Sequence, residues 1–244
     1  MYTNEDLWEP YVSANDGNVI DAYKNKCGFI TGNVLDGSVL IVNTDLIGDI
    51  KIEGYEDLLN PALKGKIATA DPANSSSAFA HLTNMLLAMG GYEDDKAWQY
   101  VHDLFENVDG KICESSSAVY KGVADGEYVV GLSYEDPCAQ LVLDGAPVKL
   151  VYMKEGTVFL PASATIIKGA KNMDNAKLFV DYVLSEEAQT ALSKTTIRGT
   201  MTSIAQDCPE MKPFEEINVV YEDQAAVAEL QTEMLEKWTN LLTK

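Results

Sequence analysis

Two serine triplets have the residue types and the spacing that could bind a ligand. They are Ser75, Ser76 and Ser77, and Ser115, Ser116 and Ser117. Each lies between the end of a predicted strand and the start of a predicted helix, where free N–H groups and the helix dipole favour an anion. Serine is also a preferred helix cap, so one triplet alone is typical of capping. Two triplets at equivalent strand ends favour an oxyanion site.

A third strand end carries a different set of side chains. Tyr134 and Glu135 follow the predicted strand EYVVGL, and Pro137 comes next but one in the chain. Ligands of open α/β sheets bind at the carboxyl ends of strands, so we expect these residues to reach the same crevice as the serines. Tyr134 could hydrogen-bond to a ligand or stack on it, and Glu135 could accept from a ligand amine or coordinate a cation. The alternative is helix-start charge, with Asp136 as the cap and Pro137 at the first helical position.

The sequence gives little support to catalysis. It contains no G-x-S-x-G, H-E-x-x-H, P-loop or G-x-G-x-x-G pattern, and only two histidines, His81 and His102. Serine turns without a histidine base are poor nucleophiles. The four cysteines form no C-x-x-C pair and lack zinc-ligand spacing, which favours buried or half-buried structural thiols. We therefore expect neither an enzyme nor a bound cofactor.

The overall charge excludes several classes of partner. The chain has 244 residues with 18 Lys and Arg against 38 Asp and Glu, a net charge of −20. Nucleic-acid binding and docking on an anionic membrane both need basic residues, so neither is expected. No stretch approaches the ~18 apolar residues of a membrane span, and the polar start MYTNEDLWEPYV predicts no signal peptide in this chain.

The order of predicted elements is mixed α/β. Residues 66–153 alternate strands and helices, which predicts a parallel-rich sheet with helices on both faces. Two consecutive helices follow from Asn172, and the first is expected to pack through Phe179, Val180, Val183 and Leu184. The chain closes on an amphipathic helix from Ala226. Its apolar residues, spaced by three or four, are Val227, Leu230, Met234, Trp238 and Leu241.

Three segments carry a resemblance to a known family: LLNPALKGKIATADPANSSSAF from Leu58, SSSAVYKGVADGEYVVGLSYED from Ser115, and GAPVKLVYMKEGTVFLPASATIIKGAKNMDNAKLFVDYVLSEEAQ from Gly145. They resemble, in order and spacing, segments of family 1 extracellular solute-binding proteins. These are the binding components of ABC importers, in the branch of ferric-ion, phosphate-ester and aminoethylphosphonate binders. The resemblance runs from about Leu7 to about Ser203.

The resemblance implies a type 2 periplasmic-binding-protein fold of two α/β lobes. Residues 50–152 would form a complete ligand-binding lobe, and residues 1–49 with 153–244 a partial lobe lacking its first half. Hinge strands would lie near 39–44 and 158–166. The implied function is extracytoplasmic capture of a small anion, a phosphorylated compound or a phosphonate, and its delivery to membrane permease subunits. Arg198, where the family chain returns toward the cleft, could pair with that anion or be a surface residue.

Two alternatives remain open. Ferric-binding members use a tandem tyrosine pair where this chain has only Tyr134, so Tyr134 would be the recognisable phenolate of an iron site. A chain without the first half of one lobe could also be a truncated, assembly-dependent form that is not a receptor.

A prediction about assembly follows from the incomplete lobe. Phe179, Val183, Leu230, Met234 and Trp238 would lose the sheet that covers them in the family. The chain would then either compact this lobe around the C-terminal helix or bury the face in a homodimer, because exposing several such side chains costs more than a domain's spare stability.

Overall fold

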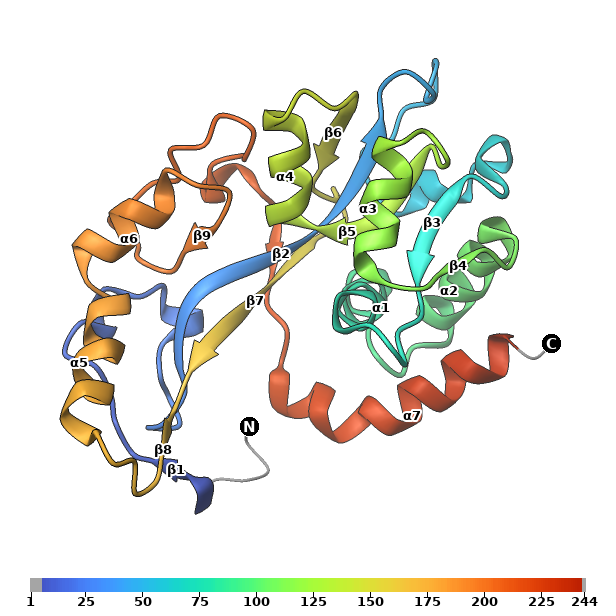
Figure 1. Cartoon of the computed structure of the whole chain (residues 1–244). Helices are drawn as coiled ribbons and strands as arrows, with labels where there is room; N and C mark the ends of the chain where they lie inside the picture. The colour runs from blue at the N-terminus through green and yellow to red at the C-terminus, as the bar shows by residue number, and fades with distance from the viewer. Residues whose placement is uncertain (1–5, 243–244) are drawn as a thin grey trace. The chain divides into compact units, whose positions relative to one another are not determined.

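The structure, a computed structural model, describes residues 6–242 and divides the chain into two compact units (Figure 1). The first unit consists of residues 1–36 and 160–214, and the second of residues 37–159 and 215–244. Compared with the predicted lobes, residues 37–49, 153–159 and 215–244 therefore move into the second unit. Two of the boundaries fall inside strands, β2 (Thr31–Asn43) and β7 (Thr157–Ala164), close to the segments expected to be hinges.

The strands that residues 66–153 contribute to the sheet of the second unit all run in one direction, as predicted, but β2 (Thr31–Asn43) runs antiparallel to two of them. β3 (Ile67–Ala70) runs parallel to β5 (Val130–Tyr134) and to β4 (Ile112–Cys113). The second half of β2 is antiparallel to β5 and to β6 (Val148–Val151), so β6 points the same way as β5. A further strand, β10 (Val219–Val220), is parallel to the start of β7. The carboxyl ends of β3, β4 and β5 therefore meet at one edge of the sheet.

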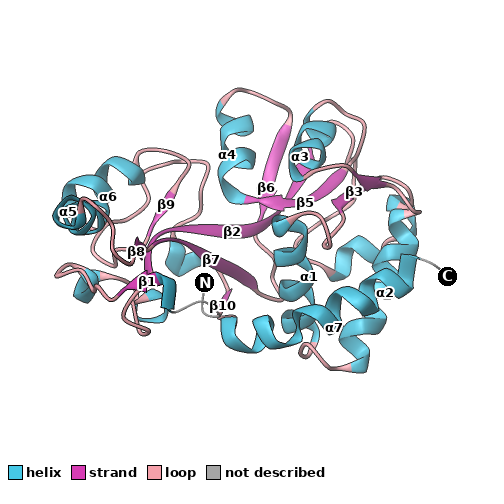
Figure 2. Ribbon diagram, turned by 60° about the horizontal axis from the view of Figure 1, so that its bottom comes forward, coloured by secondary structure: helices cyan, strands magenta, loops and turns pink. Residues whose placement is uncertain are grey.

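Helices cover both faces of this sheet (Figure 2). α1 (Ser76–Met89) and α2 (Asp95–Val108) lie on one side, and α3 (Ser116–Ala124) and α4 (Glu135–Leu143) on the other. A Cβ on Gly131 of β5 would collide with two valine side chains of α3, so glycine is what allows α3 to approach the strand. Short 3-10 helices, Glu56–Leu59 and Pro61–Leu63, precede β3.

The last helix, α7 (Gln224–Leu242), packs into the core of the second unit. Met234 and Trp238 are buried there, and the Trp238 ring meets Phe105 of α2 edge-on, with centroids 5.4 Å apart. The sequence predicted that the partial lobe compacts around this helix, whereas the structure packs the apolar stripe of the helix into the core of the second unit. This packing removes the main reason for expecting a homodimer at that helix.

The first unit is smaller and is built from short strands and two helices. β1 (Trp8–Glu9) pairs with β8 (Ile166–Ile167), and β9 (Arg198–Gly199) pairs with the first half of β2. α5 (Met173–Val183) and α6 (Glu186–Ser193) follow β8. The buried Gln189 joins these elements: its amide donates to the carbonyls of Asn33 and Val183, and its carbonyl accepts from Thr200 N.

One face of α5 is exposed, contrary to the packing role predicted for Phe179. Phe179 is 59% exposed, and its neighbours Leu178 and Tyr182 are exposed as well, whereas Val180 and Leu184 are buried. The same helix holds the start of the described chain, because Asp181 accepts hydrogen bonds from Tyr11 Oη at 2.6 Å and Ser13 Oγ at 2.7 Å.

The negative charge is concentrated in the second unit. Its sequence contains 26 acidic and 10 basic residues, a net charge of −16, whereas the first unit contains 12 acidic and 8 basic residues, a net charge of −4. The four cysteines carry free thiols, with Cys138 and Cys208 buried and Cys27 and Cys113 half-buried, as predicted. None of the helices formed by residues 6–242 is long and apolar enough to cross a bilayer.

Candidate functional site

The first serine triplet forms the start of α1. Ser75 is the N-cap: its Oγ accepts from Ala78 N at 3.4 Å and lies 3.2 Å from Ser77 Oγ. Ser76 is exposed at the first helical position, and within the described residues its hydroxyl has no hydrogen-bond partner. The N–H groups of Ser76 and Ser77 have no acceptor inside the helix, because the first turn of any α-helix lacks them. Capping thus explains Ser75 and leaves the donors of Ser76 available.

The second triplet repeats the same geometry at the start of α3. Ser115 Oγ accepts from Ala118 N at 3.2 Å and lies 3.0 Å from Ser117 Oγ. Ser116 is half-buried at the first helical position, and its hydroxyl likewise has no partner in the described part of the chain. The two triplets are therefore equivalent local structures, each with one capping serine and one serine that is not used for capping.

At the third strand end, the helix α4 (Glu135–Leu143) begins two residues earlier than predicted, because its N-cap is Tyr134 and not Asp136. Tyr134 is the N-cap of α4, and Glu135 and Asp136 occupy the first two helical positions. Pro137 is consequently the third helical residue rather than the first, and Asp136 is not the cap. The Tyr134 ring is half-buried and meets Tyr120 of α3 edge-on, with centroids 6.2 Å apart. Tyr134 therefore joins β5 to α4 and contacts the side chain of Tyr120 in α3.

Glu135 points into the protein rather than outward. It is 1% exposed, and its Oε1 accepts a hydrogen bond from Tyr152 Oη at 2.5 Å. A carboxylate held in this way at a helix N-terminus interacts favourably with the helix dipole. The hydrogen bond with Tyr152 and the helix dipole thus explain the position of Glu135 without a ligand. To bind a cation, the Glu135 carboxylate would have to coordinate it while also accepting the hydrogen bond from Tyr152.

The three turns leave the sheet at the same level. Ala70 of β3 is the register partner of Cys113 of β4, and the pairing of Ala68 with Gly131 places Ala70 beside Ser133 of β5. The next residues along the chain are Asp71, Glu114 and Tyr134, so the turns before α1, α3 and α4 begin side by side. The Ser133 Oγ at this level is buried and has no hydrogen-bond partner among residues 6–242. The two serine turns and Tyr134 therefore follow strand ends at the same edge of the sheet.

A buried histidine connects α1 to the end of β5. His81, 1% exposed, places Nε2 2.5 Å from the Ser133 carbonyl oxygen and Nδ1 3.0 Å from Tyr55 Oη. Burial lowers the pKa of His81 to about 4, although backbone hydrogen bonds with Ser133 and Val39 act in the opposite direction. The ring is thus neutral near pH 7. This contact could not be predicted from the sequence, because one histidine on a helix face does not reveal its partners.

Arg198 has the environment of an interior residue of the first unit. It is 4% exposed, its Nη2 donates to the Lys212 carbonyl oxygen at 2.8 Å, and its guanidinium lies 5.9 Å from the centre of the Phe214 ring. These contacts explain why an arginine is tolerated at a buried position. They do not require a ligand.

Metal-binding side chains do not gather at the serine turns. Among the described residues there is no group of three His, Cys, Asp or Glu side chains that could hold a metal ion. Asp71, at the start of the first turn, accepts from Ala73 N and Asn74 Nδ2 and from Trp238 Nε1. Its carboxylate is therefore occupied by the turn itself and by α7.

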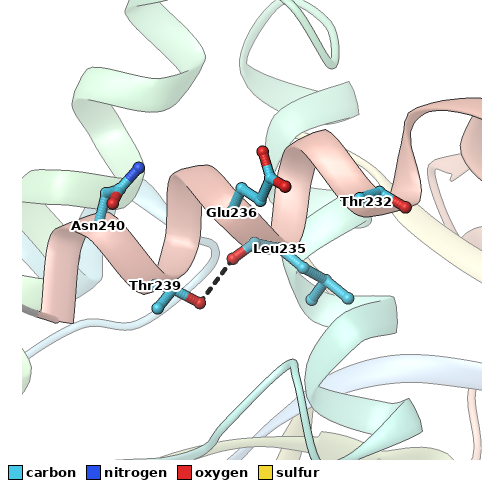
Figure 3. Close-up of a pocket in the computed structure, with 5 residues that line it drawn as sticks. All are labelled: Thr232, Leu235, Glu236, Thr239 and Asn240. Carbon is cyan, nitrogen blue, oxygen red and sulfur yellow. Dashed lines mark hydrogen bonds between the residues drawn. The ribbon is translucent and has the colours of Figure 1, made fainter.

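A separate hollow of about 520 Å³ lies along the exposed face of α7 (Figure 3). The residues that line it are Thr232, Leu235, Glu236, Thr239 and Asn240. Thr239 Oγ1 already donates to the Leu235 carbonyl oxygen at 2.8 Å, as Figure 3 shows. The hollow contains none of the residues predicted to bind a ligand.

Comparison with known proteins agrees with this architecture. Residues 1–224 match the family model described as bacterial extracellular solute-binding protein. A solved structure of the periplasmic binding protein AfuA from Actinobacillus pleuropneumoniae, with exogenous fructose-6-phosphate bound, superposes with a TM-score of 0.82. It is 27% identical, and the match covers 100% of this chain and 79% of that one. The likeness confirms the predicted α/β fold of periplasmic binding proteins.

Two curated relatives extend the comparison. An uncharacterized protein of Haemophilus influenzae is 28% identical over 95% of this chain and 69% of its own length. Iron uptake protein A1 of Synechocystis is 24% identical over 72% of this chain and 51% of its own length. This chain therefore spans about two thirds of the first relative and half of the second. Since the family model covers nearly the whole sequence, the chain belongs to the bacterial extracellular solute-binding proteins.

Proposed function

We propose that this chain captures a small phosphorylated solute outside the cytoplasm and delivers it to the membrane subunits of an ABC importer, without a chemical step. The proposed site is the group of turns that begin at the same level of the sheet in the second unit. Its ligand-binding residues are the serines of the two triplets, with Tyr134 at their side.

The observation that carries the proposal is the pair of equivalent helix starts. α1 and α3 each begin with unused backbone N–H groups and one uncommitted hydroxyl, of Ser76 or Ser116, and the strands that precede them end at the same edge of the sheet. A phosphoryl group has several acceptor oxygens and a negative charge, which is what such donors and helix dipoles bind. The AfuA structure supports this ligand class, since it carries fructose-6-phosphate at 27% identity.

A substitution that favours the helix but repels an anion tests this proposal. In the double variant Ser76→Asp, Ser116→Asp, each carboxylate sits at a first helical position, where it stabilises the helix by about 0.3 to 1 kcal/mol. The same carboxylates repel a phosphoryl group. We expect fructose-6-phosphate to lose affinity at least about tenfold by calorimetry, while the protein remains as stable as the wild type. The neutral control, Ser76→Asn with Ser116→Asn, should lose much less affinity for fructose-6-phosphate.

Wild-type protein supplies the primary measurement. A ligand at a hundredfold excess over its Kd raises the free energy of unfolding by about 2.7 kcal/mol, which a thermal-shift screen detects. If inorganic phosphate, fructose-6-phosphate and phosphonates all leave the melting temperature unchanged, while ferric iron raises it, the phosphoryl proposal is wrong.

Ferric iron is the second candidate ligand. The half-buried Tyr134 phenol at the same edge, the net charge of −16 of this unit and the likeness to iron uptake protein A1 favour it. Ferric citrate should then produce a visible tyrosinate-to-iron absorption band that Tyr134→Phe abolishes. The Ser→Asp double variant, which is expected to weaken the binding of an anion, should not weaken the binding of ferric iron.

A further inference from the structure

In the buried hydrogen bond between His81 and the end of β5, the donor and the acceptor can be assigned. The Ser133 carbonyl oxygen can only accept, so the proton of the neutral ring is on Nε2. Nδ1 is then an acceptor, and the Tyr55 hydroxyl donates to it. Tyr55 is fully buried, and its own carbonyl oxygen accepts from Tyr100 Oη at 2.6 Å. The tautomer of His81 is therefore fixed from both sides.

This contact joins two of the turns that form the proposed site. His81 lies in α1 five residues after Ser76, within one rigid helix. Ser133 directly precedes Tyr134, the cap of α4. Because the hydrogen bond links the helix to the carbonyl immediately before the cap, it sets where Tyr134 lies relative to the N–H groups of Ser76 and Ser77.

We propose that His81, oriented by Tyr55, is a positioning residue for ligand binding: it holds the end of β5 at the distance from the start of α1 that the ligand requires. The proposal rests on the proposed function for its ligand. Its structural part does not, since the position of the β5–α4 junction can be measured without a ligand.

Three variants separate positioning from general stability. His81→Met fills the space and removes the hydrogen bonds of the ring, His81→Gln keeps a donor that can reach Ser133, and Tyr55→Phe removes only the hydroxyl that orients the ring. Leu86→Ala is the matched control, because Leu86 is a fully buried residue of the same helix that packs in the core.

The readouts are the Kd for fructose-6-phosphate and the hydrogen exchange of the amides of residues 134–136. We expect His81→Met to raise the Kd about tenfold, or about 1.4 kcal/mol, and to speed exchange in that segment. His81→Gln should stay within about threefold of the wild type, and Tyr55→Phe should change both readouts in the direction of His81→Met. Leu86→Ala should lower the melting temperature while leaving both readouts unchanged.

The outcomes separate this inference from the proposed function. Unchanged exchange at residues 134–136 in both His81→Met and Tyr55→Phe overturns it, whether or not a ligand binds. If wild-type protein binds no phosphoryl compound, the proposed function fails and the exchange measurement alone decides the role of His81. If His81→Met does not fold, Tyr55→Phe supplies the same test. Equal effects of Leu86→Ala and His81→Met on the Kd would reduce the role of His81 to stability.

Discussion

The indole nitrogen of Trp238 donates a hydrogen bond to Asp71 Oδ1 at 3.0 Å, across 167 positions of sequence. Asp71 opens the turn that leads to the first serine triplet, and Trp238 lies in the last helix of the chain. The same carboxylate accepts from Ala73 N and Asn74 Nδ2, so the turn and α7 share one acceptor group. The C-terminal helix therefore supports the turn before α1 as well as completing the core.

Replacing Trp238 with phenylalanine tests that support. Trp238→Phe keeps an aromatic ring against Phe105 and removes the donor to Asp71. A hydrogen bond to a charged group contributes about 1.5 to 3 kcal/mol, so we expect a loss of stability near the lower end of that range. Urea denaturation measures it. Asp71→Asn retains an acceptor for the indole and should cost less stability than Trp238→Phe. An equal or larger loss in Asp71→Asn would show that the carboxylate matters mainly for the turn and not for the contact with Trp238.

The pH dependence of stability should report on His81. Its pKa is about 4 in the folded protein against 6.5 for the free side chain. A base whose pKa is lowered by folding contributes stability that is fully present above its unfolded pKa and is lost as the pH falls toward the folded value. The difference of about 2.5 units corresponds to about 3 kcal/mol.

The measurement is the free energy of unfolding near pH 7 and near pH 4.5 for wild type and His81→Gln. Carboxylates titrate in both proteins, so the difference between the two isolates the histidine. We expect the wild type to lose more stability on acidification than the variant. Parallel pH profiles would show that His81 is not kept neutral by its surroundings.

Ser75 and Ser76 should differ in what they contribute. Ser75→Ala removes the cap of α1 and should cost about 1 kcal/mol of stability. Ser76→Ala removes a hydroxyl without a partner among the described residues, so the stability should stay within about 0.5 kcal/mol of the wild type. Thermal denaturation compares the two. A large stability loss in Ser76→Ala would mean that its hydroxyl has a structural role.

A side chain at Gly54 should displace a carboxylate that is hydrogen-bonded to the backbone. A Cβ there would overlap the carboxylate of Glu155, which accepts from Tyr55 N and Glu56 N, each at 3.0 Å. Gly54→Ala should therefore displace the carboxylate and cost about 2 kcal/mol. In a Glu155→Ala background the same change should cost clearly less, because the clash is gone. If the stability losses of Gly54→Ala and Glu155→Ala were additive, the cost of Gly54→Ala would come from the backbone at residue 54 and not from the contact with Glu155.

Substitution of Phe179 should have little effect on folding. Its side chain is 59% exposed on α5, so Phe179→Ser should change the melting temperature little and reduce binding of the dye ANS. Val180→Ser, which changes a side chain only 3% exposed on the same helix, is the control and should be strongly destabilising. A marked loss of stability in Phe179→Ser would show that this face is covered in solution.

Local patterns predicted most of the fold. The helix start at Ser185 follows from its capping residue, and Ser185 Oγ accepts from Ala188 N at 3.1 Å. The alternation of strands and helices between residues 66 and 153 predicted the parallel edge where the serine turns meet. Both signals are local, so they can be read without knowing what packs against what.

The surfaces against which the apolar helix faces pack could not be predicted in the same way. The spacing of Met234 and Trp238 shows that α7 is amphipathic, but it does not show that this face packs into the core of the second unit. The same limit applies to Phe179, whose periodic position resembles that of the buried Val180. Likewise, Pro137 is compatible with several positions in the first helical turn. Tyr134 becomes the cap because β5 continues to that residue and α4 begins directly after it.

The concentration of acidic residues in the second unit has a kinetic consequence. A unit of net charge −16 repels an approaching phosphate ester at long range, whereas the helix starts act only over a few ångströms. Salt screens the long-range part far more than the short-range part. The association rate of an anionic solute should therefore rise with ionic strength, the reverse of ordinary electrostatic steering, so the protein would load faster in brackish or saline surroundings than in dilute ones.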